Sequence, residues 1–229
     1  MKCLVAIAVS REWTETEFLM QMGTWQMPTA WQVRFGFFRQ FTASERHNVM
    51  VGETFNNYDR IVFMDTDQAY PPDYLMEMLR HDEPIVTALN VSRYYPFEYT
   101  IYNVGETKLR YGMEVPEFVP MTPPVDKRIF ECDVTGTGAL MLDPKVLTDL
   151  PRPYFKDVFE PDGCVRLIPD DFYFCLQLYK AGIKITVDQG IIVRHMAKIL
   201  AAPYNAMHLR KAWEAVNAGY GHFKDGKNP

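Results

Sequence analysis

The 229-residue sequence has no long apolar run and no closely spaced pair of cysteines. No stretch approaches the roughly 20 apolar residues that a membrane-spanning helix requires, so we expect no membrane span. The four cysteines are scattered without a C-x-x-C pair, which gives no signal for a zinc site or a disulfide framework. A reducing compartment is the simplest interpretation, and we expect a cytoplasmic protein.

The sequence also lacks an excess of positive charge: its net charge is −5 and its pI is about 5.6. A dominant nucleic-acid-binding surface usually carries such an excess, so charge does not indicate DNA as a partner. Hydrophobic residues make up 48% and charged residues 23%, as in ordinary globular domains. Without a repeat or a linker, we expect one domain over 1–229, with a core at 1–196 and a C-terminal helix and tail at 197–229.

Short apolar runs alternate with amphipathic segments along the chain, and this alternation predicts an α/β fold with a mostly parallel sheet flanked by helices. A Tyr-rich stretch at 93–112 predicts a small antiparallel hairpin insertion, with Gly105 at its centre. Ser44 is the expected N-cap of one helix. The expected elements are strands at 4–9, 31–38, 61–64, 84–89, 130–134, 139–142, 184–188 and 191–193, helices at 15–22, 43–56, 74–80, 144–150, 170–181 and 206–218, and loops at 114–128 and 151–169.

Two acids, Asp65 and Asp67, directly follow the apolar strand predicted at 61–64. Ligands of open α/β sheets bind beyond the carboxyl ends of the strands. Two carboxylates placed there repel each other unless a cation neutralises them, and carboxylate plus phosphate oxygens suit Mg²⁺ or Mn²⁺. The alternative is a strand-end turn with solvated acids.

Two further groups lie at predicted element ends. Asp170 and Asp171 begin a helix, where one acid can serve as a cap or as a general base for an acceptor hydroxyl. His195 follows an apolar strand, where a neutral imidazole suits an Mn²⁺-like ion or simply fills a structural role.

A short glycine turn and one arginine complete the candidate residues. Gly136 and Gly138 flank Thr137, which is too short a pattern for the G-x-G-x-x-G dinucleotide fingerprint. These glycines permit either a close approach to a ligand or a bulge between strands. Arg46 has the fork geometry that matches oxyanions, and it lies on a predicted helix whose face is otherwise expected to be solvated.

Taken together, these segments resemble the GT-A glycosyltransferases, specifically the short family-2-like members found in bacteria and their viruses. The resemblance rests on Ser-Glu-Arg-His-Asn (44–48), Tyr-Asp-Arg-Ile-Val-Phe-Met-Asp-Thr-Asp-Gln-Ala-Tyr-Pro-Pro-Asp (58–73), Thr-Gly-Thr-Gly-Ala-Leu-Met-Leu (135–142) and the segment from 170–182 to Val-Arg-His (193–195). These segments stand in the family's order over most of 1–196. The resemblance implies a Rossmann-like GT-A sheet, a nucleotide-sugar donor, expected to be a UDP-sugar, and a divalent metal, Mn²⁺ or Mg²⁺.

The resemblance also implies roles for individual residues. Asp67 would bind the metal directly with His195, and Asp65 would touch the metal or the ribose. Asp171 would be the base of an inverting transfer, next to Asp170, which stands where the family more often has Glu. The residues implied to contact the donor are Ser10, Arg11, Arg46, Asp65, Thr66 and Gly138.

Four questions stay open from the sequence. A nucleotidyltransferase acting on a nucleoside triphosphate and a sugar phosphate is one alternative, although no Gly-rich phosphate loop follows the first strand. A non-catalytic nucleotide-sugar-binding module is another. The acceptor is unassigned among a glycan, a metabolite and a modified DNA base, and a viral source would place the protein in the host cytoplasm. Arg210 and Lys211 on the last predicted helix suit DNA, an anionic membrane or solvent.

Overall fold

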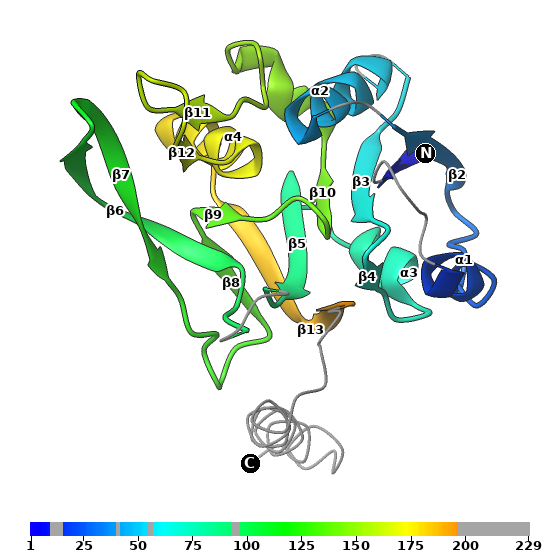
Figure 1. Cartoon of the computed structure of the whole chain (residues 1–229). Helices are drawn as coiled ribbons and strands as arrows, with labels where there is room; N and C mark the ends of the chain where they lie inside the picture. The colour runs from blue at the N-terminus through cyan, green and yellow to red at the C-terminus, as the bar shows by residue number, and fades with distance from the viewer. Residues whose placement is uncertain (10–15, 40–41, 55–56, 93–96, 197–229) are drawn as a thin grey trace, which may run out of the picture. The chain divides into compact units, whose positions relative to one another are not determined.

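A mixed eight-stranded sheet forms the centre of the computed structural model (Figure 1). The structure describes residues 1–9, 16–39, 42–54, 57–92 and 97–196. The part from Met1 to Met196 is one compact unit, and the helix expected at 206–218 lies outside the described residues. None of the described helices is long and apolar enough to cross a membrane.

The elements follow the predicted alternation of strands and helices. In chain order they are β1 (Lys2–Ala8), α1 (Thr16–Met22), β2 (Gln32–Phe38), α2 (Ala43–Thr54), β3 (Arg60–Asp65), β4 (Gln68–Ala69), α3 (Tyr74–Met78), β5 (Ile85–Asn90), β6 (Ile101–Arg110), β7 (Met113–Pro120), β8 (Ile129–Cys132), β9 (Val134–Thr135), β10 (Leu140–Leu142), the 3₁₀ helix η1 (Pro144–Asp149), β11 (Val158–Phe159), β12 (Arg166–Ile168), α4 (Asp170–Lys180) and β13 (Ile185–His195).

The main sheet has the strand order β2-β1-β3-β10-β5-β13-β4, and β8 pairs with β13. Five of its strands, β1, β2, β3, β5 and β13, run in one direction, so the sheet is mostly parallel as predicted. Strand β10 lies between β3 and β5 and is antiparallel to both. The start of β10 therefore lies at the same edge of the sheet as the ends of β3 and β5.

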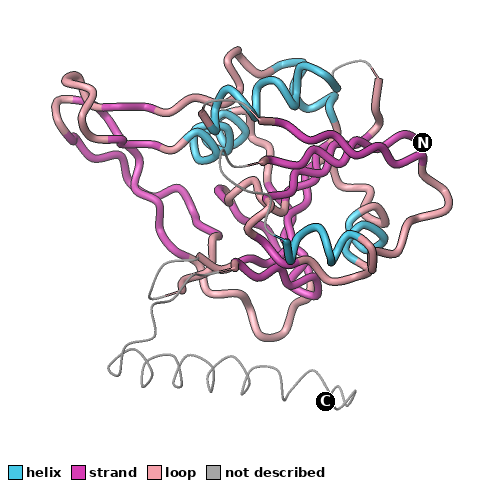
Figure 2. The backbone as a smooth tube through the Cα atoms, turned by 45° about the vertical axis from the view of Figure 1, so that its right-hand side comes forward, coloured by secondary structure: helices cyan, strands magenta, loops and turns pink. Residues whose placement is uncertain are grey.

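Helices cover both faces of this sheet, as the tube view shows (Figure 2). Alternate residues of β1 point to opposite faces because the side-chain period of a strand is two residues. Leu4 and Ala6 pack in the core that includes residues of α2 and α4, whereas Val5 and Ile7 pack in the core that includes residues of α1 and α3. Burial on both faces explains why β1 and β3 are continuous apolar runs.

The antiparallel insertion exists, but its predicted turn was wrong. Strands β6 and β7 form a hairpin that turns at Tyr111 and Gly112, which have φ of 50° and 75°. Gly105 instead lies inside β6, where the register shifts between Val104 and Thr107. The loop predicted at 114–128 was wrong over β7, because its prolines are tolerated on an edge strand of the small sheet β7-β6-β9.

Three further predictions differ from the structure. The strands predicted at 184–188 and 191–193 are one strand, β13, with a register shift between Asp188 and Ile192. The loop predicted at 151–169 contains the two-stranded sheet β11-β12. Helix α2 is capped by Thr42 rather than Ser44: the Thr42 hydroxyl accepts from the Glu45 N–H, and the Glu45 carboxylate accepts from the Thr42 N–H.

Candidate active site

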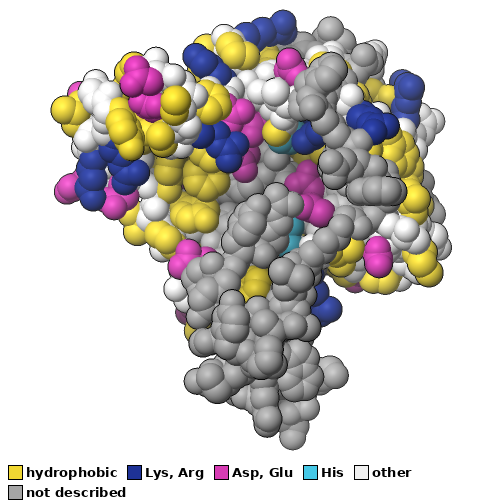
Figure 3. Space-filling model, viewed as in Figure 1, with side chains coloured by type: hydrophobic (Ala, Val, Ile, Leu, Met, Phe, Trp, Pro, Cys, Tyr) yellow, Lys and Arg dark blue, Asp and Glu magenta, His cyan; other side chains and the backbone are white. Residues whose placement is uncertain are grey.

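Several of the predicted site residues lie at the carboxyl edge of the main sheet. Asp65 is the last residue of β3, and His195 is the last residue of β13. Gly138 precedes β10, which enters the sheet from this edge because it runs antiparallel to β3. In the space-filling view, acidic and histidine side chains lie close together in the middle of this face (Figure 3).

Gly138 lies directly against the carboxylate of Asp65. A Cβ atom at position 138 would be 2.4 Å from Asp65 Oδ2 and 2.2 Å from Gln68 Nε2, so any residue larger than glycine would displace these two side chains. The buried Tyr70 hydroxyl accepts from the Asp65 backbone N–H (2.7 Å) and lies 2.5 Å from the Gly138 carbonyl, to which it donates. Tyr70 therefore fixes the glycine turn to the end of β3.

Asp65, Asp67 and His195 form an electrostatically coupled group. Burial raises the pKa of Asp65, and the charge of Asp67 raises it further, while His47, His195 and Arg46 act to lower it. His195 is paired in register with Gln68, and the Met196 N–H donates to the Asp67 carbonyl (2.8 Å). The structure thus brings His195 beside the two acids, although 127 residues separate it from Gln68.

The hydrogen bonds of His195 define where its proton lies. Nδ1 is 2.5 Å from the Val91 carbonyl oxygen, which can only accept, so Nδ1 carries the hydrogen. Nε2 then has a lone pair, which faces the Gln68 side-chain amide at 3.1 Å. A metal-binding histidine likewise donates from one ring nitrogen to a carbonyl. For Nε2 of His195 to coordinate an ion, the Gln68 amide would have to give up this contact.

Among the described residues, no group of three or more His, Cys, Asp or Glu side chains is already arranged to hold a metal ion. Mg²⁺-type sites commonly use one or two carboxylates and leave the remaining positions to water and substrate phosphates. Asp65 and Asp67 supply such a carboxylate pair, whose mutual repulsion a cation would relieve. The donor set of this edge therefore fits a divalent ion shared with a phosphorylated ligand.

A buried chain of hydrogen bonds lies behind the glycine turn. His47 of α2 contacts Asp170 of α4 (Nδ1 to Oδ2, 2.7 Å) and Thr137 (Nε2 to Oγ1, 3.2 Å). All three side chains belong to buried residues, with exposed fractions of 6% or less. This chain joins α2, the glycine turn and α4.

Asp171, the next residue along α4, has a different environment from Asp170. Its Oδ1 accepts from the Phe172 backbone N–H (2.9 Å), and its Oδ2 lies 3.7 Å from where a Cβ of Gly136 would be. Burial raises the pKa of Asp171 to about 7, with a further contribution from the charge of Asp170. A carboxyl group with this pKa is suited to exchange a proton near neutral pH.

The remaining residues predicted to contact the donor differ in their surroundings, and two of them are not described. Arg46 donates from Nη1 to the Val9 carbonyl (3.2 Å) at the end of β1, and its buried Nε has no hydrogen-bond partner among the described residues. Thr66 is 3% exposed, so its side chain is turned inward. Ser10 and Arg11 lie outside the described residues.

Four residues of this arrangement had no role in the sequence prediction: His47, Gln68, Tyr70 and Thr137. His47 and Thr137 stand beside the predicted residues Arg46 and Gly138, which was the only available signal. Gln68 and Tyr70 follow Asp67 within three positions, but their contacts with Gly138 and His195 depend on the tertiary structure.

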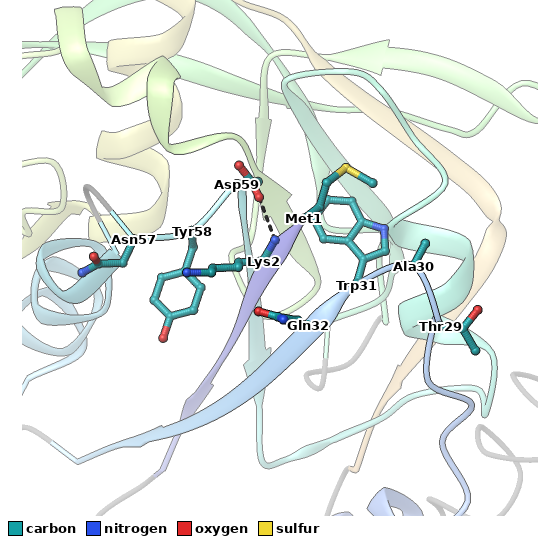
Figure 4. Close-up of a pocket in the computed structure, with 9 residues that line it drawn as sticks. All are labelled: Met1, Lys2, Thr29, Ala30, Trp31, Gln32, Asn57, Tyr58 and Asp59. Carbon is teal, nitrogen blue, oxygen red and sulfur yellow. Dashed lines mark hydrogen bonds between the residues drawn. The ribbon is translucent and has the colours of Figure 1, made fainter.

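A separate hollow of about 750 Å³ lies at the other end of the strands (Figure 4). Lys2, Gln32 and Asp59 line it at or near the starts of β1, β2 and β3, and the Lys2 backbone N–H donates to the Asp59 carboxylate (2.7 Å). It contains none of the acids of the carboxyl edge. Chemistry based on Asp65 and Asp171 therefore belongs to the other edge of the sheet.

No protein-family model and no curated protein sequence matches this chain. Among solved structures, A197 from STIV is similar with a TM-score of 0.52 and 13% identity, over 86% of this chain and 87% of that one. GalNAc-T7 with UDP, GalNAc and Mn²⁺ gives 0.54 and 10% identity, over 89% of this chain but 45% of its own. The catalytic domain of Drosophila β1,4-galactosyltransferase 7 with xylobiose gives 0.51 and 12%, over 90% and 79%.

These similarities show that the chain has the GT-A glycosyltransferase fold, which confirms the predicted fold class. The family-2-like subtype stays a prediction.

Proposed function

We propose that this protein is a metal-dependent glycosyltransferase that moves a sugar from a nucleotide-sugar donor to an acceptor hydroxyl. One observation carries the proposal. At the carboxyl edge of a GT-A sheet, the glycine turn 136–138 has Asp65 against its Gly138 and Asp171 near its Gly136. The carboxylate pair suits a metal–diphosphate, and Asp171 suits an acceptor hydroxyl. The two groups thus lie at the two ends of one short turn.

The donor would lie beside the Gly138 end of the glycine turn, next to Asp65 and Arg46. Gly138 leaves room for the close approach of a ligand beside the Asp65 carboxylate. The buried Arg46 Nε, which has no hydrogen-bond partner in the described part of the chain, suits an anionic ligand, because a buried donor left unpaired is costly. GalNAc-T7, a similar structure, holds UDP and Mn²⁺, which supports a UDP-sugar as the first donor to test.

Asp65, Asp67 and His195 would hold the divalent ion. When bound, this ion would neutralise the charge that develops on the departing diphosphate. The chain's own contribution is to orient the ligands: Tyr70 fixes the end of β3, and the Val91 carbonyl fixes the His195 ring. The charged and polar side chains are then already in position before the reaction begins, which is called preorganisation.

Asp171 would act as the base. Its Oδ2 takes the proton of the acceptor hydroxyl while the acceptor oxygen forms a bond to the anomeric carbon. The bond from that carbon to the diphosphate oxygen breaks, and its electron pair leaves with the nucleoside diphosphate. Attack opposite the leaving group inverts the anomeric centre, so the product configuration, read by NMR, tests the inverting assignment.

The test of the proposed function is thermal unfolding with Mn²⁺ and a panel of UDP-, GDP-, dTDP- and CMP-sugars. Binding to the native state alone stabilises it by about 2.7 kcal/mol at a hundredfold excess over Kd. We expect a shift in Tm that requires Mn²⁺ and appears with one nucleotide class, UDP first. Asp67→Asn should abolish the shift, whereas the matched change Asp126→Asn, in an exposed loop position, should keep it.

Other outcomes point elsewhere. A shift with nucleoside triphosphates, followed by pyrophosphate release with a sugar phosphate, would identify a nucleotidyltransferase. A donor-dependent shift without any release of nucleotide would identify a binding module. No shift with any nucleotide-sugar in a folded sample would contradict the proposed function.

A further inference from the structure

Three partly exposed aromatic rings meet beside Asp171: Tyr102 of β6, Phe118 of β7 and Phe172 of α4. The ring centroid of Phe172 is 5.1 Å from that of Tyr102 and 4.8 Å from that of Phe118. We call these three rings the aromatic platform. Phe172 is the next residue of α4 after Asp171, and the charge of Asp171 acts on the Tyr102 hydroxyl, so the aromatic platform lies near the carboxyl group that would act as the base.

Two polar groups border the aromatic platform, the Tyr102 hydroxyl and Asp171 Oδ2. Neither the Tyr102 hydroxyl nor Asp171 Oδ2 makes a hydrogen bond to a side chain or backbone group among the described residues. Burial raises the pKa of Tyr102, and the charges of Glu98 and Asp171 raise it further, so both carboxylates lie within electrostatic range of the hydroxyl. Glu98 itself is exposed.

We propose that the aromatic platform is the acceptor subsite and that it takes a neutral saccharide. One apolar face of its pyranose ring would pack on one of the rings, because the planes of Tyr102 and Phe118 are tilted by 55° and 71° from that of Phe172. The inference rests on the proposed function, because it assigns the second substrate of the same site. The acceptor hydroxyl would then point along the platform toward Asp171 Oδ2. The Tyr102 hydroxyl and the Glu98 carboxylate would bind neighbouring sugar hydroxyls.

The chemistry of the surface distinguishes a saccharide from the other acceptors. Pyranose rings combine C–H faces that pack on aromatic rings with hydroxyls that donate to carboxylates. Phosphodiesters require cations, yet the charges that act on the Tyr102 hydroxyl are the carboxylates of Glu98 and Asp171. Lys108, on the same hairpin, is already paired with Glu117 (2.7 Å). A neutral polyhydroxylated ring therefore fits better than DNA.

The experiment measures release of the nucleoside diphosphate from the donor that stabilises the protein. Candidate acceptors are p-nitrophenyl gluco-, galacto-, manno- and N-acetylglucosaminopyranosides, compared with a 20-base-pair duplex DNA. We expect at least one glycoside to stimulate release and the duplex not to. Stimulation by the duplex alone, or by none of the probes while the donor still shifts the Tm, would overturn the inference.

Variants test whether the platform itself binds the acceptor. Phe118→Leu keeps an apolar side chain but removes the ring, and Tyr102→Phe removes only the hydroxyl. Each should raise the KM for the glycoside, by about tenfold for Phe118→Leu, since one aromatic contact accounts for about a factor of ten. The matched control is Phe37→Leu, which changes an exposed phenylalanine of β2 and should leave this KM unchanged.

The two proposals fail in different ways. Absence of any donor-induced Tm shift in the unaltered protein contradicts the proposed function. A normal donor shift combined with an unchanged glycoside KM in both platform variants contradicts only the acceptor subsite.

Discussion

His47 and Asp170 form a buried hydrogen bond of 2.7 Å that joins α2 to α4. This bond separates the roles of two adjacent acids. Asp170 is engaged by His47 inside the protein, whereas Asp171 keeps one carboxylate oxygen toward the glycine turn. This difference supports our proposal that Asp171, rather than Asp170, meets the substrate.

We expect His47→Ala to reduce stability by about 3 kcal/mol, since removing one partner of a buried pair leaves the other uncompensated. Urea unfolding at pH 7 measures this loss. The double variant His47→Ala/Asp170→Asn should recover part of the stability, because it removes the buried charge as well. A loss of well under 1 kcal/mol in the single variant would show that the His47–Asp170 pair does not contribute to the stability of the fold.

The rate of transfer should rise with pH through about 7. The base must be ionised to accept a proton, and burial, with the charge of Asp170, raises the pKa of Asp171 to about 7. A profile of kcat/KM against pH measures this rise on its acidic side. Asp170→Asn removes one of the charges that raise this pKa, so the acidic limb should move to lower pH; an unmoved limb would contradict the assignment.

Asp171→Asn should lower kcat by about 10²–10⁴-fold, the usual contribution of a general base. Donor binding should persist, because the donor contacts are proposed on the Asp65 side of the turn. Steady-state kinetics together with the donor-induced Tm shift separate the two effects. Asp126→Asn is the matched control at an exposed aspartate. Near-normal turnover in Asp171→Asn would remove it from the base role.

Gly138→Ala should weaken donor binding at least tenfold, because the new Cβ would lie 2.4 Å from Asp65 Oδ2 and displace that carboxylate. Isothermal titration with the stabilising nucleotide-sugar and Mn²⁺ measures the change. Gly52→Ala is the matched control, since that glycine lies in α2 with nothing within 4 Å of a new Cβ. The control should keep full affinity and gain about 0.5–1 kcal/mol of stability. Unchanged affinity in Gly138→Ala would place the donor elsewhere.

The layered core was predictable from the sequence because burial on both faces produces continuous apolar runs, as in β1 and β3. The direction of β10 was not predictable: three apolar residues, Leu140–Leu142, fit a strand of either direction. Strand β7 was missed since Pro116 and Pro120 are loop signals unless the strand lies at an edge.

In the candidate site, too, some residues could be predicted from the sequence and others could not. Asp65, Asp67, Asp171 and His195 were predicted as site residues because acids and imidazoles at element ends are a chemical signal. Tyr70 was not, because its role is to join the Asp65 N–H to the Gly138 carbonyl, and nothing in its local sequence indicates a partner 68 residues away. Contacts that hold a site in place depend on the packing of whole elements.

The two-residue turn at Tyr111 and Gly112 ends a hairpin whose sheet is separate from the main sheet. Adding residues at this turn would lengthen β6 and β7 without shifting the register of β3, β10 or β13. The hairpin can therefore change in length while the edge of the main sheet that carries Asp65 and His195 keeps its geometry. The same turn offers an insertion point for a fluorescent or affinity peptide.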